Sequence, residues 1–435
     1  MSGAPTPVQA RRRFVGLTAL RWLPLGTSVP VTVLLASARG LSPADIGVVL
    51  AVYSTTTLVL ELPAGGLADA IGHRPVLVVS GLLTTAGLLA MALADGMASF
   101  ALAWGLLGIG RALDSGPLEA WYVDAVHTTD PSADVASGLS RAAAANGLGL
   151  AVGAALGGSL PLVTETPGAA GLAVPLLLAA ALTGVSVAAV AVLVVPLRTP
   201  SGSGVAVLTA GFRELPVVVR DTGLLVHRDR VLQRLLVISS ATGVALVSIE
   251  LLGPLHVAGL AGGRTEGAAV FGVVMAVSFT AAGLGSLWAP AARRAARGSV
   301  AWVSGVSAGL AALSVAAVAL APGLTVAATA VVLFYLLNAI GWPVRQHLLH
   351  ERTTSSRRST TVSAGSLALM SGGLLGNLLL PRLTEVAGTA AGLLAGAAAV
   401  LVIALLSPGL RRARRPAGSA HDRLEVDRVQ RAPRG

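Results

Sequence analysis

Ionisable side chains inside one long apolar stretch are the most chemically informative residues of this sequence. Residues 99–123 are largely apolar, yet they contain Arg111, Asp114 and Glu119. Arg111 and Asp114 are three residues apart and share one face of a helix, so they can form an ion pair. Burial favours a protonated carboxyl group and a nearby guanidinium favours the ionised form, so movement of Arg111 would load or release a proton. We therefore expect Asp114 and Glu119 to carry protons; a static ion pair between Arg111 and Asp114 is the alternative.

Three further charged residues, Arg21, Glu61 and Glu250, lie within other apolar stretches. A charged side chain at the centre of a bilayer costs about 2.5–3.5 kcal/mol on insertion scales, so each of them requires a partner or a function. Glu61 lies toward the inner end of its stretch, where gating is at least as plausible as substrate contact. Glu250 precedes Gly253-Pro254, and its alternative position is the outer membrane interface.

The residue types exclude several classes of catalytic site. The sequence contains no cysteine, and all 31 of its basic residues are arginine. Thiolate nucleophiles, Walker-type phosphate loops and Schiff-base lysines are therefore absent. His347 and His350 have a spacing that could hold a metal, but the positive charge of Arg345 and Arg352 beside them disfavours a cation. We expect no enzyme activity, no metal and no cofactor.

The composition excludes a soluble fold. Hydrophobic residues make up 54% of the 435 residues, charged residues only 12%, and the mean hydropathy is +0.78, whereas about a quarter of the residues of an average soluble domain are charged. The 52 glycines and the few aromatic residues (3%) suit helices that pack closely in a bilayer. The net charge of +11 comes from arginines in short segments between apolar runs, a pattern that does not indicate nucleic-acid binding.

Twelve apolar segments are long enough to be transmembrane helices, which need about 20 residues. They are 14–37, 45–68, 75–95, 99–123, 139–163, 170–196, 233–258, 267–289, 300–320, 323–346, 361–384 and 387–408. Most arginines fall in every second connecting segment, which places both chain ends in the cytoplasm by the positive-inside rule. Within the fourth segment, Gly116 and Pro117 should bend the helix. We expect a multi-pass protein of the plasma membrane.

The twelve segments divide the chain into five regions. They are a cytoplasmic N-terminal segment (1–13), an N-terminal six-helix bundle (14–196), a cytoplasmic linker with an amphipathic helix (197–232), a C-terminal six-helix bundle (233–409) and a basic cytoplasmic tail that we expect to be disordered (410–435). The segment Gly65–Arg74 aligns with Gly285–Arg294 and shares its first glycine, a leucine and the final arginine. This match predicts that the two halves are parallel six-helix repeats.

Several short motifs resemble those of the major facilitator superfamily. The segment Gly65–Arg74 is similar to the family's loop signature between spans two and three, and Glu61-Leu62-Pro63 resembles the E-x-P that often precedes that loop. Residues 149–158 are similar to the antiporter signature G-x-x-x-G-P-x-x-G-G, with Ala154 in place of the proline. Leu107–Arg111 resembles the family's membrane-embedded arginine motif. The resemblance extends from about residue 14 to residue 408.

The resemblance implies an all-α membrane protein with 12 transmembrane helices in two pseudo-symmetric six-helix bundles. Its function would be secondary active transport, and the glycine motif favours proton-coupled efflux (antiport) of a small molecule by alternating access. The alternative is a proton-coupled importer or facilitator of a metabolite such as a sugar or amino acid. Spans one, four, seven and ten face the pathway in this family, so Arg21, Arg111, Asp114, Glu119 and Glu250 would line a central cavity. We expect a monomer in the lipid bilayer whose partners are a small-molecule substrate and protons, without nucleic acid.

The loop motif has the features of a gate. Gly65 and Gly72 permit a tight turn, and Arg74 ends the motif. Asp69 can accept hydrogen bonds from the start of the helix near residues 360–361, across the interface between the halves. Such a contact would hold the cytoplasmic side shut, whereas a plain turn with a solvated Asp69 is the alternative.

A stripe of small residues is expected on one face of the fifth span. Gly149, Gly153 and Gly157 recur at four-residue intervals, and Gly158 lies beside them. Residues four apart share a helix face, so the stripe is nearly smooth and predicts a close, bendable contact with another helix. Ordinary helix packing would need the same stripe.

Overall fold

The chain is helical throughout its described part. The computed structural model describes residues 5–164, 166, 168–197, 203–213, 220, 229–351 and 358–410, with the backbone alone at 62 and 358–363. These residues form helices joined by short connections and contain no β-strand. The all-α membrane fold expected from the sequence is therefore confirmed.

The helices fall into two groups separated by the linker. The N-terminal group is α1 (Pro7–Ser28), α2 (Thr32–Ala38), α3 (Pro43–Gly65), α4 (Leu67–Ile71), α5 (His73–Leu93), α6 (Met97–Asp114), α7 (Pro117–Thr129), α8 (Ala136–Val163) and α9 (Gly168–Leu193). The C-terminal group is α11 (Arg230–Ala261), α12 (Arg264–Ala295), α13 (Val300–Ala319), α14 (Leu324–Glu351), α15 (Arg358–Ala387), α16 (Thr389–Leu406) and the 3-10 helix η2 (Ser407–Leu410). A short helix, Gly204–Arg213, lies in the linker.

Local sequence signals determine where two of the helices begin. At α1 the Thr6 hydroxyl accepts a hydrogen bond from the Gln9 N–H (3.3 Å), and the Gln9 side chain accepts one from the Thr6 N–H (3.1 Å). Ser42 and Asp45 make the same reciprocal pair at α3. Each pair satisfies two N–H groups at a helix start. Both helices then begin with a proline, which has no N–H to satisfy there.

Eleven helical spans of the described residues are long and apolar enough to cross a membrane. The other predicted span, 99–123, is divided into α6 and α7, because Gly116 adopts a left-handed conformation (φ 98°) and Pro117 begins the next helix. The bend predicted at this point is therefore a break in the helix. The count of twelve spans stays a prediction.

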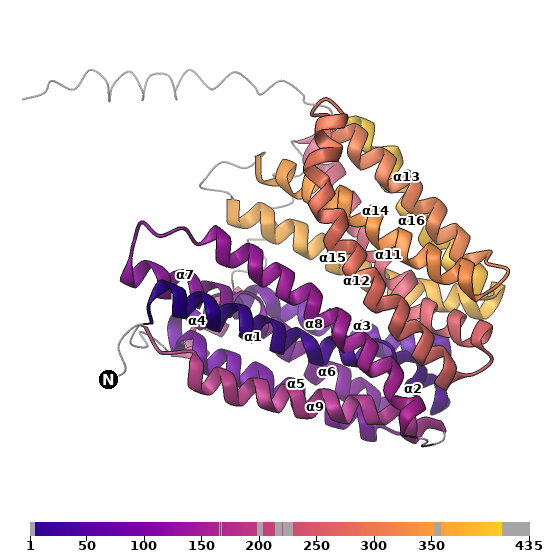
Figure 1. Cartoon of the computed structure of the whole chain (residues 1–435), viewed down its shortest axis with the longest axis horizontal. Helices are drawn as coiled ribbons and strands as arrows, with labels where there is room; N and C mark the ends of the chain where they lie inside the picture. The colour runs from indigo at the N-terminus through magenta and orange to yellow at the C-terminus, as the bar shows by residue number, and fades with distance from the viewer. Residues whose placement is uncertain are drawn as a thin grey trace, which may run out of the picture.

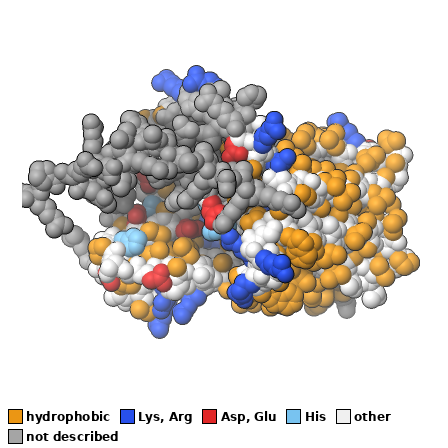
Figure 2. Space-filling model, turned by 90° about the horizontal axis from the view of Figure 1, so that it is seen from above, with side chains coloured by type: hydrophobic (Ala, Val, Ile, Leu, Met, Phe, Trp, Pro, Cys, Tyr) orange, Lys and Arg blue, Asp and Glu red, His pale blue; other side chains and the backbone are white. Residues whose placement is uncertain are grey.

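Large apolar side chains are exposed on the outside of the helices. Leu93, Leu102, Val192 and Leu287 are each more than 60% exposed. Figure 2 shows hydrophobic side chains over much of the described surface on one side of the molecule, with basic side chains at its margin. A surface of this kind suits contact with lipid rather than with water.

The two groups form two bundles that lie close together at one end and diverge toward the other (Figure 1). Across the interface α8 packs on α12, and α3 packs on α15. At the closed end, the Ala44 N–H donates a hydrogen bond to the Glu385 carboxylate (2.9 Å). By the arginine pattern, the closed end is the predicted outer side and the diverging end is the predicted cytoplasmic side.

Glycines mark where the bundles meet and where they part. A Cβ at Gly158 of α8 would lie 2.7 Å from the Cα of Gly272 of α12, so only glycine permits this approach. Eleven residues nearer the cytoplasmic side on the same two helices, Gly147 and Gly283 have no atom within 4 Å of a Cβ placed on them. Eleven residues are about three helical turns, so these glycines continue the same two faces. The faces touch near the outer side and separate toward the inner side.

Candidate functional site

A cavity of about 500 Å³ has walls from both bundles. This volume falls within the range of roughly 300–1,000 Å³ that small-molecule sites occupy. Its walls are largely apolar, and its charged residues are Arg21, Arg111, Asp114 and Glu250. The structure thus brings together four of the charged residues that the sequence singled out.

Asp114 pairs with Arg21, a partner on another helix. The Asp114 carboxylate, at the end of α6, forms an ion pair with the Arg21 guanidinium of α1. The side chains of Arg21 and Asp114 are 15% and 28% exposed, so the pair lines the cavity but is largely shielded from solvent. The expected ion pair between Asp114 and Arg111 within one helix is therefore wrong, because α1 brings a competing guanidinium to the end of α6.

Arg111 is held by aromatic side chains. Its guanidinium carbon lies 5.9 Å from the centre of the Trp22 ring, within the range of a cation–π contact. It also lies close enough to Tyr53 and Glu61 of α3 to interact electrostatically with both. Tyr53 in turn packs edge-on against Trp104 at 5.5 Å between ring centres. Arg111 is thus connected to α1 and α3 and is free of Asp114.

Glu250 is the acidic residue that the C-terminal bundle contributes to the cavity. The Tyr335 hydroxyl of α14 donates a hydrogen bond to the Glu250 carboxylate (3.2 Å). Tyr335 is itself buried, with Phe334 and Phe279 edge-on to its ring at 5.4 Å and 5.9 Å. Among the described residues no arginine forms an ion pair with Glu250. Glu250 therefore faces the cavity with a neutral partner, and it does not lie at the outer interface.

Glu119 lies apart from the cavity. It is exposed in the first turn of α7, and it is absent from the residues that line the cavity. The sequence pattern placed Glu119 on one continuous helix with Arg111. The left-handed Gly116 breaks that helix, so Glu119 of α7 does not keep the helical register of Arg111. The expected cavity position of Glu119 is therefore not the one observed.

Two polar residues that the sequence did not single out connect the bundles. The Asn377 amide of α15 donates a hydrogen bond to the Ser54 hydroxyl of α3 (3.1 Å), and both residues line the cavity. Asn377 is only 5% exposed. A single amide in an apolar span is a weak signal, because it could equally satisfy a partner in its own bundle.

The predicted gating loop has the expected tight geometry. Gly65 ends α3, and Gly72 has φ 93° between α4 and α5, a conformation that favours glycine. Asp69 of α4 and Arg74 of α5 are exposed. The expected partner of Asp69 near residues 360–361 lies outside the side chains that the structure describes, so the contact stays a prediction.

Two other elements support this loop. Leu208 of the linker helix packs against the cluster formed by Leu67, Ala68 and Val76. On the other side, His73 lies 3.4 Å from the Asp124 carboxylate of α7. The described part of the linker is therefore packed on the loop of the N-terminal bundle.

The glycine stripe of α8 faces α1. A Cβ at Gly149 would lie 2.7 Å from the Ala19 carbonyl oxygen, and one at Gly153 or Gly157 would overlap the backbone of α1 more severely. Gly158 faces α12 in the other bundle instead. The stripe therefore packs α8 against α1, and the neighbouring Gly158 packs α8 against α12 of the other bundle.

Arg345 is buried, whereas its position in the sequence predicts an exposed side chain. It lies near the inner end of span 323–346, where an arginine is expected to meet solvent, yet it is only 5% exposed. Its guanidinium donates a hydrogen bond to the Asn338 side chain (3.3 Å) seven residues earlier on α14. The arginine extends back along its own helix into the bundle.

Residues 15–377 match the family model of the Major Facilitator Superfamily. The chain belongs to the major facilitator superfamily. As a member of this superfamily it is a membrane transporter and a multi-pass integral protein of the plasma membrane. The two-bundle fold and the cavity between the bundles agree with this membership.

Solved transporters have the same fold. The nucleoside transporter NupG aligns with a TM-score of 0.71 at 13% identity, over 93% of this chain and 100% of that chain. The peptide transporter POT in complex with sulfate aligns with a TM-score of 0.68 at 15% identity, over 92% and 94%. The human organic anion transporter MFSD10 (TETRAN) aligns with a TM-score of 0.63 at 14% identity, over 93% and 100%. At these identities the likeness concerns the fold alone.

One curated relative is similar over a shorter region. The inner membrane transport protein YajR of Escherichia coli is 35% identical over 104 residues, which are 23% of this chain. The match spans about a fifth of that relative's length (21%). Its activity therefore gives no substrate for this chain.

Proposed function

We propose that this transporter exports a small molecule in exchange for protons, by exposing its central cavity alternately to the two sides of the membrane. The proposal includes twelve spans, with α6 and α7 together as the fourth, cytoplasmic chain ends, and a monomer as the working unit. Alternating access requires contacts between the bundles that form on one side and open on the other.

The observation that carries proton coupling is the position of two carboxyl groups on one cavity. Asp114 comes from the N-terminal bundle and Glu250 from the C-terminal bundle, and each has one partner on a neighbouring helix. A carboxyl group whose partner moves away is left in an apolar wall and takes up a proton, and it loses the proton when the partner returns. Arg21 and Tyr335 are these partners, so Asp114 and Glu250 are the coupling groups.

The cavity walls favour an amphipathic substrate with a basic group. Trp22, Tyr53, Trp104 and Phe279 line the cavity, although aromatic residues are only 3% of the sequence. Aromatic faces bind planar apolar groups and attract cations. Glu250, with its neutral partner, adds a negative charge beside these aromatic rings, which favours a cation in the cavity.

The direction of transport rests on the glycine motif of α8. Gly149, Gly153 and Gly157 press α8 against α1, the helix that carries Arg21. A close contact without side chains lets these helices shift together. The resemblance of this motif to an antiporter signature favours export.

Import or facilitated passage of a metabolite such as a sugar or amino acid is the second candidate. The nucleoside transporter NupG and the peptide transporter POT share the fold, so the scaffold accommodates metabolite-sized substrates. The same cavity and coupling groups would serve proton symport.

The test uses everted membrane vesicles with an imposed proton gradient and a pH-sensitive dye. A chemically broad panel is screened for compounds that collapse the gradient in the wild type. We expect amphipathic bases to do so, and we expect Asp114→Asn and Glu250→Gln to abolish the response. Glu119→Gln is the matched control, an acidic residue outside the cavity, and should respond like the wild type. A silent panel, with protein verified in the membrane, would favour import or uncoupled passage.

A further inference from the structure

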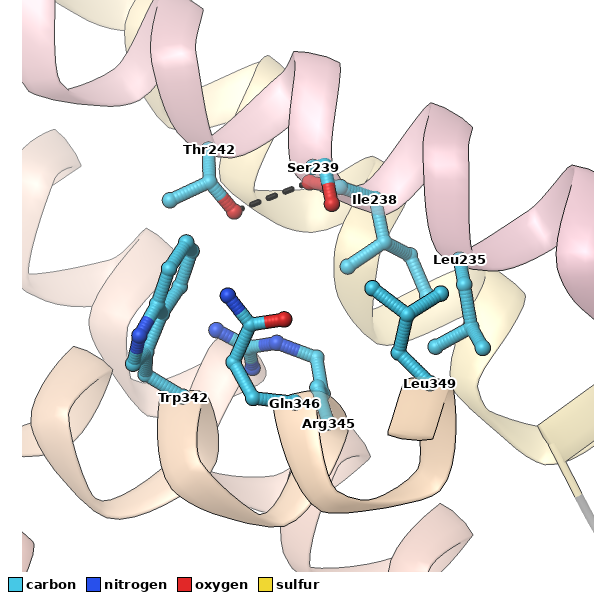
Figure 3. A pocket seen from close by; sticks show the side chains of 8 residues that line it. All are labelled: Leu235, Ile238, Ser239, Thr242, Trp342, Arg345, Gln346 and Leu349. Atoms are coloured by element: carbon cyan, nitrogen blue, oxygen red, sulfur yellow. Dashed lines mark hydrogen bonds between the residues drawn. The ribbon is translucent and has the colours of Figure 1, made fainter. Parts of the chain in front are cut away.

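A second and much smaller pocket lies between α11 and α14, and its lining shares no residue with the central cavity (Figure 3). Ser239 and Thr242 of α11 face Trp342, Arg345 and Gln346 of α14 across it. Its volume of about 10 Å³ is close to the space that one water molecule needs. Ser239, Trp342 and Gln346 are partly exposed, so the pocket is not sealed from the surface.

Arg345 brings an unneutralised positive charge to this pocket. It is 5% exposed, and no carboxylate of the described residues forms an ion pair with it. The Asn338 oxygen at 3.3 Å is a neutral acceptor for one of its five N–H groups. A Cβ at Gly341 would lie 2.5 Å from Arg345 Nη1, so the glycine makes room for the guanidinium against α14. A charge buried without a partner is costly, so buried charges in proteins are normally paired.

The other polar groups of the pocket are also donors. Within the described residues, no hydrogen bond engages the Ser239 hydroxyl or the Gln346 amide. The Thr242 hydroxyl donates to the Ile238 carbonyl (2.8 Å). The lining contains no acidic side chain. The Ser239 hydroxyl, the Gln346 amide and the remaining N–H groups of Arg345 therefore surround a space without a negative charge.

We propose that this pocket is an anion-binding site in which Arg345, Gln346 and Ser239 hold carboxylate or phosphate oxygens. A planar guanidinium binds such oxygens through charge-assisted hydrogen bonds. One oxygen occupies the space between α11 and α14, and the rest of the anion extends toward the partly exposed side. The oxygens belong to a soluble small molecule or to the headgroup of an inner-leaflet phospholipid, since both present the same chemistry.

The site is independent of the direction and coupling of transport. On α11, Ser239 is eleven residues from Glu250, which is about 16 Å along a helix. The test therefore measures binding alone and stands whether or not the proposed export is correct.

The test uses the full-length protein in micelles of dodecyl maltoside, a detergent without a phosphate group. Acetate, benzoate and inorganic phosphate are titrated separately, while the thermal unfolding midpoint and the tryptophan fluorescence are recorded. We expect at least one anion to raise the midpoint saturably. Arg345→Gln should weaken that binding by at least about tenfold, since it removes a charge-assisted hydrogen bond, while Arg345→Lys should retain part of it. Arg141→Gln, which removes an exposed arginine of α8, should bind like the wild type.

Two further variants keep the test decisive if Arg345→Gln fails to fold. Gln346→Leu leaves the charge of Arg345 in place but removes the Gln346 amide donor, so it should weaken anion binding. Trp342→Phe should keep the midpoint shift but remove the anion-dependent fluorescence change, since Trp342 lines the pocket.

Nanodiscs that contain phosphatidylglycerol distinguish the two sources of the anion. Stabilisation by this lipid that is lost in Arg345→Gln, without a response to the soluble anions, assigns the site to a lipid headgroup. The proposal is overturned if no soluble anion and no anionic lipid stabilises the wild type, or if a folded Arg345→Gln responds as the wild type does.

Discussion

The glycine stripe of α8 predicts a graded series of alanine effects along one helix. Gly147 and Gly149 are two residues apart, but a Cβ at Gly147 would meet no atom within 4 Å, whereas one at Gly149 would lie 2.7 Å from the Ala19 carbonyl oxygen of α1. Ordinary contact begins at 3.4 Å, so α1 must shift to accept the methyl group that Gly149→Ala adds. At Gly157 the overlap with the Thr27 backbone is more severe.

The expected magnitudes follow from two opposing terms. Alanine is favoured over glycine inside a helix by roughly 0.5–1 kcal/mol, and all three variants gain this term. Overpacking a close contact costs about 1–3 kcal/mol, and only Gly149→Ala and Gly157→Ala incur it. Gly147→Ala should therefore be neutral or slightly stabilising, Gly149→Ala should be destabilised relative to it, and Gly157→Ala should be the least stable.

The assay is reversible unfolding of the purified protein in mixed micelles of a mild detergent and dodecyl sulfate. Gly147→Ala serves as the control for the intrinsic effect of alanine on α8. Equal free energies of unfolding for the three variants would refute the claim that the stripe holds α1 against α8.

Three other predictions concern the ion pair, the gate and the motion of the bundles. Arg21→Gln and Asp114→Asn should each lower the free energy of unfolding by about 1–3 kcal/mol, which is less than breaking a fully buried ion pair costs because Asp114 is 28% exposed. In a double-mutant cycle the double variant should recover most of this loss, and additive losses would contradict the pairing. Asp69→Asn should slow transport while leaving membrane insertion intact, and undiminished transport would remove the latch role. Since the chain has no cysteine, the double variant Gly147→Cys and Gly283→Cys contains only these two thiols, which should cross-link only when the cytoplasmic side closes. Cross-linking that does not depend on substrate or on the proton gradient would contradict that motion.

Features that depend on neighbours along the chain were predictable from the sequence. The lengths of the apolar segments predict the membrane-spanning helices, because a chain segment in a bilayer must satisfy its own backbone hydrogen bonds. The tight turn at Gly72 and the helix break at Gly116-Pro117 were predictable, because both glycines adopt positive φ angles that few other residues tolerate. The stripe of α8 gives a close helix contact, although its partner, α1, does not follow from spacing.

Features that depend on which helices meet were not predictable in the same way. Spacing on one helix pairs Asp114 with Arg111, but packing brings Arg21 of α1 to Asp114 instead. The same limitation applies to Asn377, whose partner Ser54 is in the other bundle. Arg345 near a span end is typical of a residue at the membrane surface, and only the fold shows that it turns back into the bundle.

Substrate accumulation driven by an imposed pH gradient tests proton-coupled export most directly. Proteoliposomes containing the wild type or Glu250→Gln are loaded with a base selected in the vesicle screen, and both gradient-driven accumulation and exchange without a gradient are measured. We predict that the wild type does both, and that Glu250→Gln exchanges substrate but no longer accumulates it against its gradient. Accumulation by Glu250→Gln at the wild-type level would contradict the account.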